Sequence, residues 1–180
     1  LKSAEEWAGR KKGGALEALF KARDEGLVKH IVFSTHMTRE EAKSVFEEEI
    51  FEGVTLGYNA INFPIREQVV ADAGRHGLGV VVMNPLGGGL IPQHAERFDF
   101  IRSKDDPDVV SAALRFVLSN PSVTVALVGF SSKEEIDQAV AVTENFNALS
   151  AGHREALKEQ ITDKFEGLCT GCGYCLPCPQ

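Results

Sequence analysis

Several features that define common protein classes are scarce in this chain of 180 residues. No apolar run approaches the roughly 18 residues that a membrane-spanning helix needs, so no membrane partner is expected. The 19 basic residues are outnumbered by 26 acidic ones, and the resulting net charge of −7 argues against nucleic acid as a partner. Low-complexity segments and internal repeats are also missing. The 43% hydrophobic content is enough to bury a core, so the chain fits one domain or part of a larger one.

Cysteine is absent from the first 168 residues and then occurs four times in a single run. The run reads Cys169-x-x-Cys172-x-x-Cys175-x-x-Cys178-Pro179. The equal gaps wrap the backbone around one point and direct the thiolates inward, as a cubane iron–sulfur cluster requires. Thiolates kept free for metal suit a reducing, cytoplasmic location. We therefore predict that these four cysteines bind a [4Fe-4S] cluster.

Other uses of four cysteines compete with a cluster. A zinc ribbon usually separates two Cys-x-x-Cys pairs by roughly 15–20 residues, whereas this chain has one run. A disulfide framework suits a short secreted chain, and a thioredoxin-like redox pair needs only two cysteines. The bacterial ferredoxin pattern is nearest, but its last gap is one residue longer and its fourth cysteine serves a second cluster. The sequence therefore leaves open whether the protein binds one cluster or two.

Apolar runs alternate with helical patterns along the rest of the chain. The expected strands are Ile31–Phe33, Val54–Leu56, Gly79–Met83 and Val123–Val128. The expected helices begin at capping boxes at Ser3 and Thr38, after Gly14, near Glu67, at Asp106-Pro107, at Ser131 or Ser132, and near Ala151. Nearly continuous apolar strands between helices predict a parallel α/β sheet, either open and doubly wound or closed as a barrel.

Polar and glycine residues gather where each expected strand ends. Ser34 follows the first strand, Asn59 the second, Asn84 and a triple glycine the third, and Gly129 to Ser132 the fourth. In both kinds of parallel fold the chemistry lies at the carboxyl ends of the strands. The sequence therefore predicts a binding site along this edge.

Four segments together resemble the aldo/keto reductase family. Gly26–Ser34 is similar to the fifth strand of the family, and Asn84–Leu90 is similar to its seventh-strand loop. Asn120–Gly129, with the following Ser-Ser-Lys-Glu-Glu, is similar to its eighth strand and cofactor-phosphate helix. Cys169–Pro179 is similar to the ferredoxin-like tail of one subgroup. The resemblance implies the C-terminal half of a TIM (β/α)8 barrel, with four parallel strands alternating with helices, then a helix and a cysteine-rich iron–sulfur loop. Residues 1–148 would be the half-barrel, 149–168 a linking helix and 169–180 the start of a truncated ferredoxin-like segment.

The same resemblance implies an oxidoreductase that transfers hydride between NAD(P) and a small carbonyl or alcohol substrate. The family's catalytic tyrosine, lysine, aspartate and histidine lie on the first four strands, so no catalytic residue is assigned here. We expect this chain to be an inactive fragment whose missing N-terminal barrel half completes the enzyme. The cluster would pass electrons to a partner or only hold the tail in place. The alternative is a non-enzymatic zinc- or cluster-binding module on an α/β scaffold, and a sheet that binds a nucleotide without redox chemistry is a third possibility.

The cofactor contacts that the resemblance implies come from three places. Ser34 and Asn59 lie where the family holds the nicotinamide carboxamide. The loop with Leu86, Gly87 and Gly88 lets bare backbone approach a pyrophosphate. Gly129, Ser131 and Ser132 lead into a helix N-terminus that favours a phosphate, although simple helix capping explains both serines equally well.

The last of these places departs from the family. Many members carry an arginine there for the 2′-phosphate of NADP, whereas this helix reads Lys133-Glu134-Glu135, and a later asparagine position is Ala139. Two carboxylates repel a phosphate, and one lysine compensates only in part. NAD versus NADP therefore stays open.

Overall fold

The computed structural model describes residues 1–165, so the cysteine run and the predicted boundary at residue 168 lie outside the described residues. The elements follow in the order α1 (Ala4–Lys12), α2 (Ala15–Asp24), β1 (Val32–Ser34), α3 (Arg39–Phe46), β2 (Gly53–Gly57), α4 (Phe63–Arg75), β3 (Gly79–Met83), η1 (Gly87–Gly89), α5 (Leu90–Gln93), α6 (Ala95–Phe98), η2 (Asp99–Ile101), α7 (Val109–Leu118), β4 (Val123–Ala126), α8 (Lys133–Glu144) and α9 (Ala151–Phe165). Within this range every helix is too short or too polar to span a bilayer. The alternation of strands and helices confirms the predicted α/β class.

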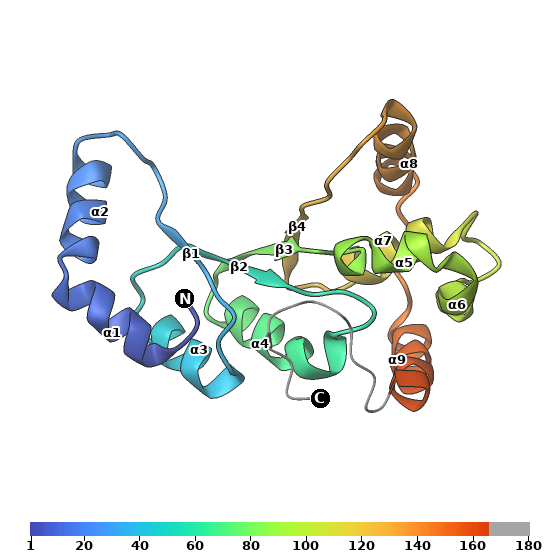
Figure 1. Cartoon of the computed structure of the whole chain (residues 1–180), viewed down its shortest axis with the longest axis horizontal. Coiled ribbons are helices and arrows are strands. Elements are labelled where there is room, and N and C mark those ends of the chain that lie inside the picture. The colour runs from blue at the N-terminus through green and yellow to red at the C-terminus, as the bar shows by residue number, and fades with distance from the viewer. Residues whose placement is uncertain (166–180) are drawn as a thin grey trace.

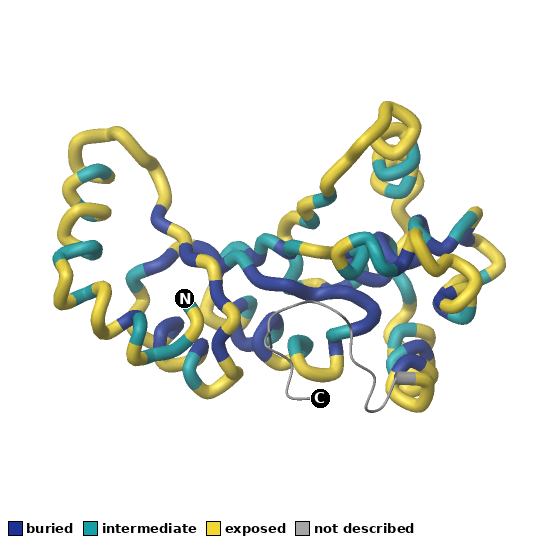
Figure 2. The backbone as a smooth tube through the Cα atoms, viewed as in Figure 1, coloured by how far each residue is buried: buried dark blue, intermediate teal, exposed yellow. Residues whose placement is uncertain are grey.

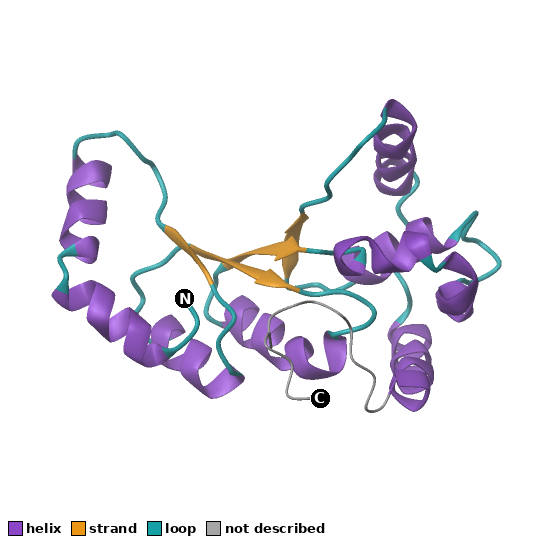
Figure 3. Ribbon diagram, viewed as in Figure 1, coloured by secondary structure: helices purple, strands orange, loops and turns teal. Residues whose placement is uncertain are grey.

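The four strands form one parallel sheet with the order β1-β2-β3-β4 (Figures 1 and 3). The register places Val54 of β2 beside Phe33 of β1 and Val80 of β3. Each connection between neighbouring strands contains at least one helix, as a parallel pairing requires. Because β1 and β4 are both edges, the described strands form an open sheet.

The two faces of the sheet differ in burial. Val54 and Val80 are completely buried, whereas Val32 and Val125, at alternate positions, are 54% and 42% exposed. In Figure 1, α3 and α4 lie below the sheet, and the region above β2 and β3, between α2 and α8, contains no described element. Neither α2 nor α8 has a buried residue, and both are mostly yellow in Figure 2. Parallel sheets are normally covered on both faces, whereas the described part of this chain covers only one face of its sheet.

Local capping signals begin three of the helices as predicted. Ser3 caps α1 by accepting a hydrogen bond from the amide of Glu6. Thr38 starts α3 with a complete capping box, in which its side chain accepts from the Glu41 amide and the Glu41 carboxylate accepts from the Thr38 amide. Ser132 caps α8 by accepting a hydrogen bond from the amide of Glu135. The caps of α3 and α8 fix where each helix leaves the strand before it.

Several predicted element bounds were wrong. Strand β1 spans Val32–Ser34 and not Ile31–Phe33. Helix α4 begins at Phe63 and not near Glu67, with Pro64 in its first turn, where the missing N–H of proline costs nothing. Strand β4 ends at Ala126 and not at Val128. The register between β3 and β4 is irregular between Val80 and Val81, near the start of β3. The short helices η1, α5, α6 and η2 between β3 and α7 were not predicted at all.

The predicted start of α7 at Asp106-Pro107 was also wrong. The N-cap is Asp108, whose carboxylate accepts from the Ser111 amide at 2.8 Å. Asp106 is instead buried, with its carboxylate 2.7 Å from the guanidinium of Arg115. This ion pair joins residues nine positions apart, so it could not be predicted from the neighbouring residues that indicate a helix cap.

Candidate functional site

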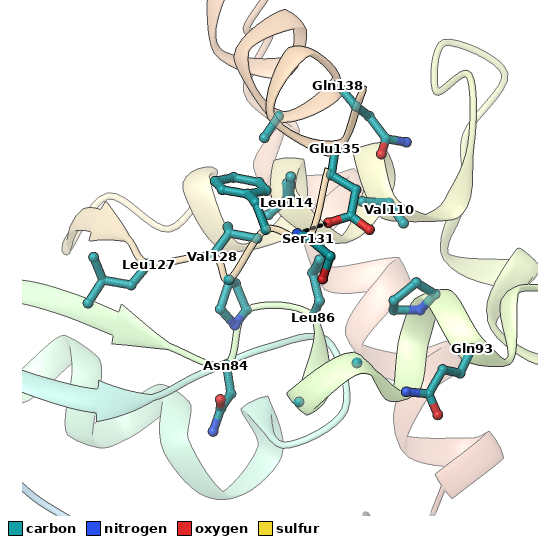
Figure 4. Close-up of a pocket in the computed structure, with 17 residues that line it drawn as sticks. Asn84, Leu86, Gln93, Val110, Leu114, Leu127, Val128, Ser131, Glu135 and Gln138 are labelled. Carbon is teal, nitrogen blue, oxygen red and sulfur yellow. Dashed lines mark hydrogen bonds between the residues drawn. The ribbon is translucent and has the colours of Figure 1, made fainter. Parts of the chain in front are cut away.

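A pocket of about 610 Å³ lies beyond the C-terminal ends of β3 and β4 (Figure 4). Its walls come from the loop after β3, the segment after β4, and the sides of α7 and α8. Val110, Leu114 and Leu127 supply apolar surface, and Glu135 and Gln138 supply polar groups. This size and this mixture are typical of a site for a small organic molecule.

The loop after β3 borders the pocket with bare backbone. Gly87, Gly88 and Gly89 have φ angles of 64°, 67° and 92°, in the left-handed region that favours glycine. A Cβ atom on Gly87 would meet Ile61 at 3.0 Å, whereas one on Gly88 would meet nothing within 4 Å. Gly88 is therefore required by its backbone angle alone, and the space beside it is open to a ligand.

The first turn of α8 forms the opposite wall of the pocket. The Glu135 carboxylate lies back over this turn and accepts a hydrogen bond from the backbone N–H of Ser131 at 2.7 Å, the bond that is dashed in Figure 4. Lys133 forms an ion pair with Asp137 at 2.5 Å. Helix N-termini attract anions because their first N–H groups lack intrahelical partners. Here a carboxylate of the helix itself already accepts from the N–H of Ser131, the residue just before the N-cap Ser132.

The structure brings together half of the eight predicted cofactor contacts. The four that line the pocket are Leu86, Gly88, Gly129 and Ser131. Gly87 belongs to the same glycine loop, and Ser132 caps α8 beside the pocket. Ser34 and Asn59 lie at or just beyond the C-terminal ends of β1 and β2, outside the pocket lining. Their roles in binding a cofactor stay predictions.

Asn59 ties the end of β2 to the pocket loop. Its side chain is 4% exposed, and its amide donates to the carbonyl of Asn84 at 2.9 Å. The same side chain accepts from the amide of Ile61 at 2.9 Å. Since Asn84 lines the pocket, Asn59 helps to hold one pocket wall in place. Ser34, by contrast, is exposed at the end of β1.

Arg66 of α4 also positions this edge, and the sequence did not point to it. Its guanidinium donates to the backbone carbonyls of Thr35, Met37 and Gly57 at 3.3, 3.0 and 3.3 Å. It therefore joins the chain after β1 to the end of β2. No sequence motif reports such a role, because the acceptors are main-chain atoms 29 and 31 residues away for two of the three bonds.

No metal site is formed by residues 1–165, since nowhere in that range do three His, Cys, Asp or Glu side chains come close enough to share an ion. The predicted cluster ligands Cys169, Cys172, Cys175 and Cys178 lie outside the described residues. Iron–sulfur binding therefore stays a prediction from the sequence.

Comparison with known proteins identifies the relatives of this fold. The sequence profile of the aldo/keto reductase family matches residues 14–160. The holo form of aldo-keto reductase AKR11C1 from Bacillus halodurans superposes with a TM-score of 0.67 and 18% identity, covering 85% of this chain and 55% of that protein. An aldo-keto reductase from Klebsiella pneumoniae in complex with NADPH gives a TM-score of 0.65 and 20% identity, covering 81% of this chain and 52% of that protein. This chain thus spans about half the length of these structures. A search of curated proteins found no match.

Proposed function

The chain belongs to the aldo/keto reductase family, and on that basis we propose that it is the C-terminal half of a barrel oxidoreductase. The intact enzyme transfers hydride between a nicotinamide dinucleotide and a small carbonyl or alcohol. The observation that carries this proposal is the pocket at the strand ends, where a loop of left-handed glycines faces the start of α8. Within residues 1–165, the edges of β1 and β4 are unpaired and one sheet face is uncovered, which supports a second half-barrel as the missing partner.

The residues of the pocket fit a dinucleotide in chemistry and in space. The backbone beside Gly88 is open, so a pyrophosphate can approach its N–H groups closely. Val110, Leu114 and Leu127 offer apolar surface to an adenine ring. Asn59 and Arg66 hold the neighbouring strand ends, and the exposed Ser34 at the end of β1 is proposed to bind the carboxamide. When bound, the nicotinamide supplies the hydride chemistry, which needs the protein only for binding and orientation.

The catalytic groups belong to the proposed N-terminal half, so no residue of this chain is given a catalytic role. Residues 1–148 form the half-barrel, residues 149–168 the linking helix, and residues 169–180 the start of the iron–sulfur segment. The cluster either exchanges electrons with a partner protein or holds the tail in place, in a cytoplasmic enzyme. Membership of an oxidoreductase family disfavours the alternative of a non-enzymatic metal-binding module.

Turnover by the protein of the complete gene tests the proposed function. Oxidation of NADH and NADPH is followed with a series of simple aldehydes and ketones. We expect nucleotide oxidation that depends on the carbonyl compound, whereas the 180-residue chain alone binds nucleotide without turnover. A full-length protein that oxidises neither nucleotide with any carbonyl compound would instead favour the non-enzymatic module.

Replacing Gly88 with alanine should weaken nucleotide binding in addition to lowering stability. The backbone at Gly88 has φ of 67°, so any side chain there costs about 1–2 kcal/mol of stability. The added Cβ would project into the open space where the pyrophosphate is proposed to lie. We expect a Kd for NADH about tenfold higher, equivalent to about 1.4 kcal/mol, measured by calorimetric titration.

Gly26→Ala is a matched control for this change. Gly26 has φ of 74° and open space around it, but it lies in the turn after α2, far from the pocket lining. It should lose similar stability in chemical denaturation and keep its nucleotide affinity. Equal affinity losses in both variants would show that the Gly88 change acts through general destabilisation and not through the site.

A further inference from the structure

We infer that Glu135 makes this pocket select NAD and reject NADP, an inference that rests on the proposed nucleotide site. Its carboxylate lines the pocket and occupies the backbone N–H of Ser131 at 2.7 Å. A 2′-phosphate bound at this helix start would compete for that donor. It would also lie next to a fixed negative charge, because the bonded carboxylate is held over the first turn of α8.

The charges around Glu135 do not offset this repulsion. Glu134 and Asp137 add two carboxylates within the first five residues of α8, and Lys133 is the only cation there. That lysine is already paired with Asp137 at 2.5 Å. Among the residues that line the pocket in the described part of the chain there is no lysine or arginine. A doubly charged phosphate therefore lacks the cationic partner that such groups normally need.

The neutral donors of the same wall are also committed. Gln138 lines the pocket, but its side-chain amide donates to the Asp108 carboxylate at 2.8 Å. Ser132 caps α8 by accepting from the Glu135 amide, and its hydroxyl is also hydrogen-bonded to the Glu134 carboxylate. The wall that would face the adenosine ribose is therefore rich in acceptors and poor in available donors.

NAD presents the complementary chemistry. Its ribose carries a 2′-hydroxyl group, which donates a hydrogen bond, where NADP carries a phosphate. Carboxylates hold this hydroxyl in other NAD-binding folds, while arginines accompany the 2′-phosphate of NADP. The same carboxylate that repels NADP can therefore accept from NAD. Glu135 is thus a specificity-determining residue and has no part in hydride transfer.

Equilibrium titration of the full chain with NADH and with NADPH, read from nucleotide fluorescence, tests this inference without an activity assay. We expect the wild-type protein to bind NADH at least about tenfold more tightly than NADPH, a difference of about 1.4 kcal/mol. Glu135→Gln keeps the shape and removes the charge, and it should lower that ratio about tenfold. Glu135→Arg should make NADPH the tighter ligand. The preference of the wild type should also shrink in high salt.

Glu144→Gln is the matched control, since it removes the same charge from the last residue of the same helix, outside the pocket lining. It should leave the ratio of the two Kd values unchanged. A wild-type protein that binds both nucleotides equally, or a ratio that Glu135→Gln and Glu135→Arg do not change, would overturn the role of Glu135 and leave the nucleotide site intact. Failure of both nucleotides to bind would overturn the proposed function and this inference together.

Discussion

Replacing Cys172 with serine in the full-length protein should remove most of the iron and acid-labile sulfide of the cluster that contains it. A serine hydroxyl stays protonated near neutral pH and is a poor substitute for a soft thiolate ligand of iron. The wild-type protein should carry about four iron atoms for each cluster of this type. Its broad visible absorption should bleach with dithionite. Metal analysis and the visible spectrum of the purified variant measure the loss.

Thr170→Ser is the control, because it alters the same run without touching a thiolate and should keep the iron content of the wild type. Cys178→Ser separates one cluster from two. If all four cysteines of the run hold one cluster, this variant should lose as much iron as Cys172→Ser. If Cys178 serves a second cluster, as the fourth cysteine does in the ferredoxin pattern, each variant should lose a different part of the iron. Wild-type protein that contains zinc and no iron would contradict the cluster and support the metal-binding module.

Local signals allowed much of the fold to be predicted. The capping box at Thr38 and the cap at Ser132 depend on neighbours within three residues, and both form as predicted. The apolar runs around Val54 and Val80 are buried strands, as predicted, because each run is continuous and lies between helices. The left-handed backbone at Gly88 could also be expected from the sequence, since consecutive glycines indicate a conformation that other residues rarely adopt.

The parts that could not be predicted depend on residues far apart in the sequence. Asp106 resembles a helix cap until its buried partner Arg115 is known. Arg66 organises two strand ends through carbonyl groups, which leave no trace in a side-chain pattern. The charge of Glu135 was visible in the sequence as a departure from the family. Its hydrogen bond to the Ser131 amide, which fixes the carboxylate at the pocket, was not.

Glu67 is a further case, because it is the centre of a cluster that attaches α9 to the half-barrel. Its carboxylate lies 2.5 Å from Arg154 and 2.8 Å from Lys158, both on α9, and it accepts from the hydroxyl of Tyr58 at 2.5 Å. The three charged side chains are only 16–17% exposed. Two cations separated from Glu67 by 87 and 91 residues thus share one carboxylate.

Glu67→Gln should lower the free energy of unfolding by about 2–3 kcal/mol, which is among the largest effects expected for a single substitution outside the apolar core. Glutamine keeps the shape and a partner for Tyr58, but it leaves the largely buried Arg154 without a counter-charge and Lys158 with only the exposed Glu155. Chemical denaturation followed by circular dichroism measures the change. Glu155→Gln is the control, since Glu155 is 69% exposed and lies 3.7 Å from Lys158. It should change stability by less than about 0.5 kcal/mol.

The pH dependence of the free energy of unfolding, compared between wild type and Glu67→Gln, tests whether the charge of Glu67 causes the loss of stability. Burial alone would raise the pKa of Glu67, but the hydrogen bonds from Lys158 and Tyr58 and the charge of Arg154 outweigh it and hold that pKa below its usual value. A carboxyl whose pKa is lowered by folding stabilises the protein above its unfolded pKa of about 4.3, and this contribution is lost as the pH falls through the lower folded value. The stability difference between wild type and Glu67→Gln should therefore be constant near pH 7 and narrow progressively below about pH 4. A difference that stays the same down to the acid transition would mean that Glu67 acts through packing and not through its charge.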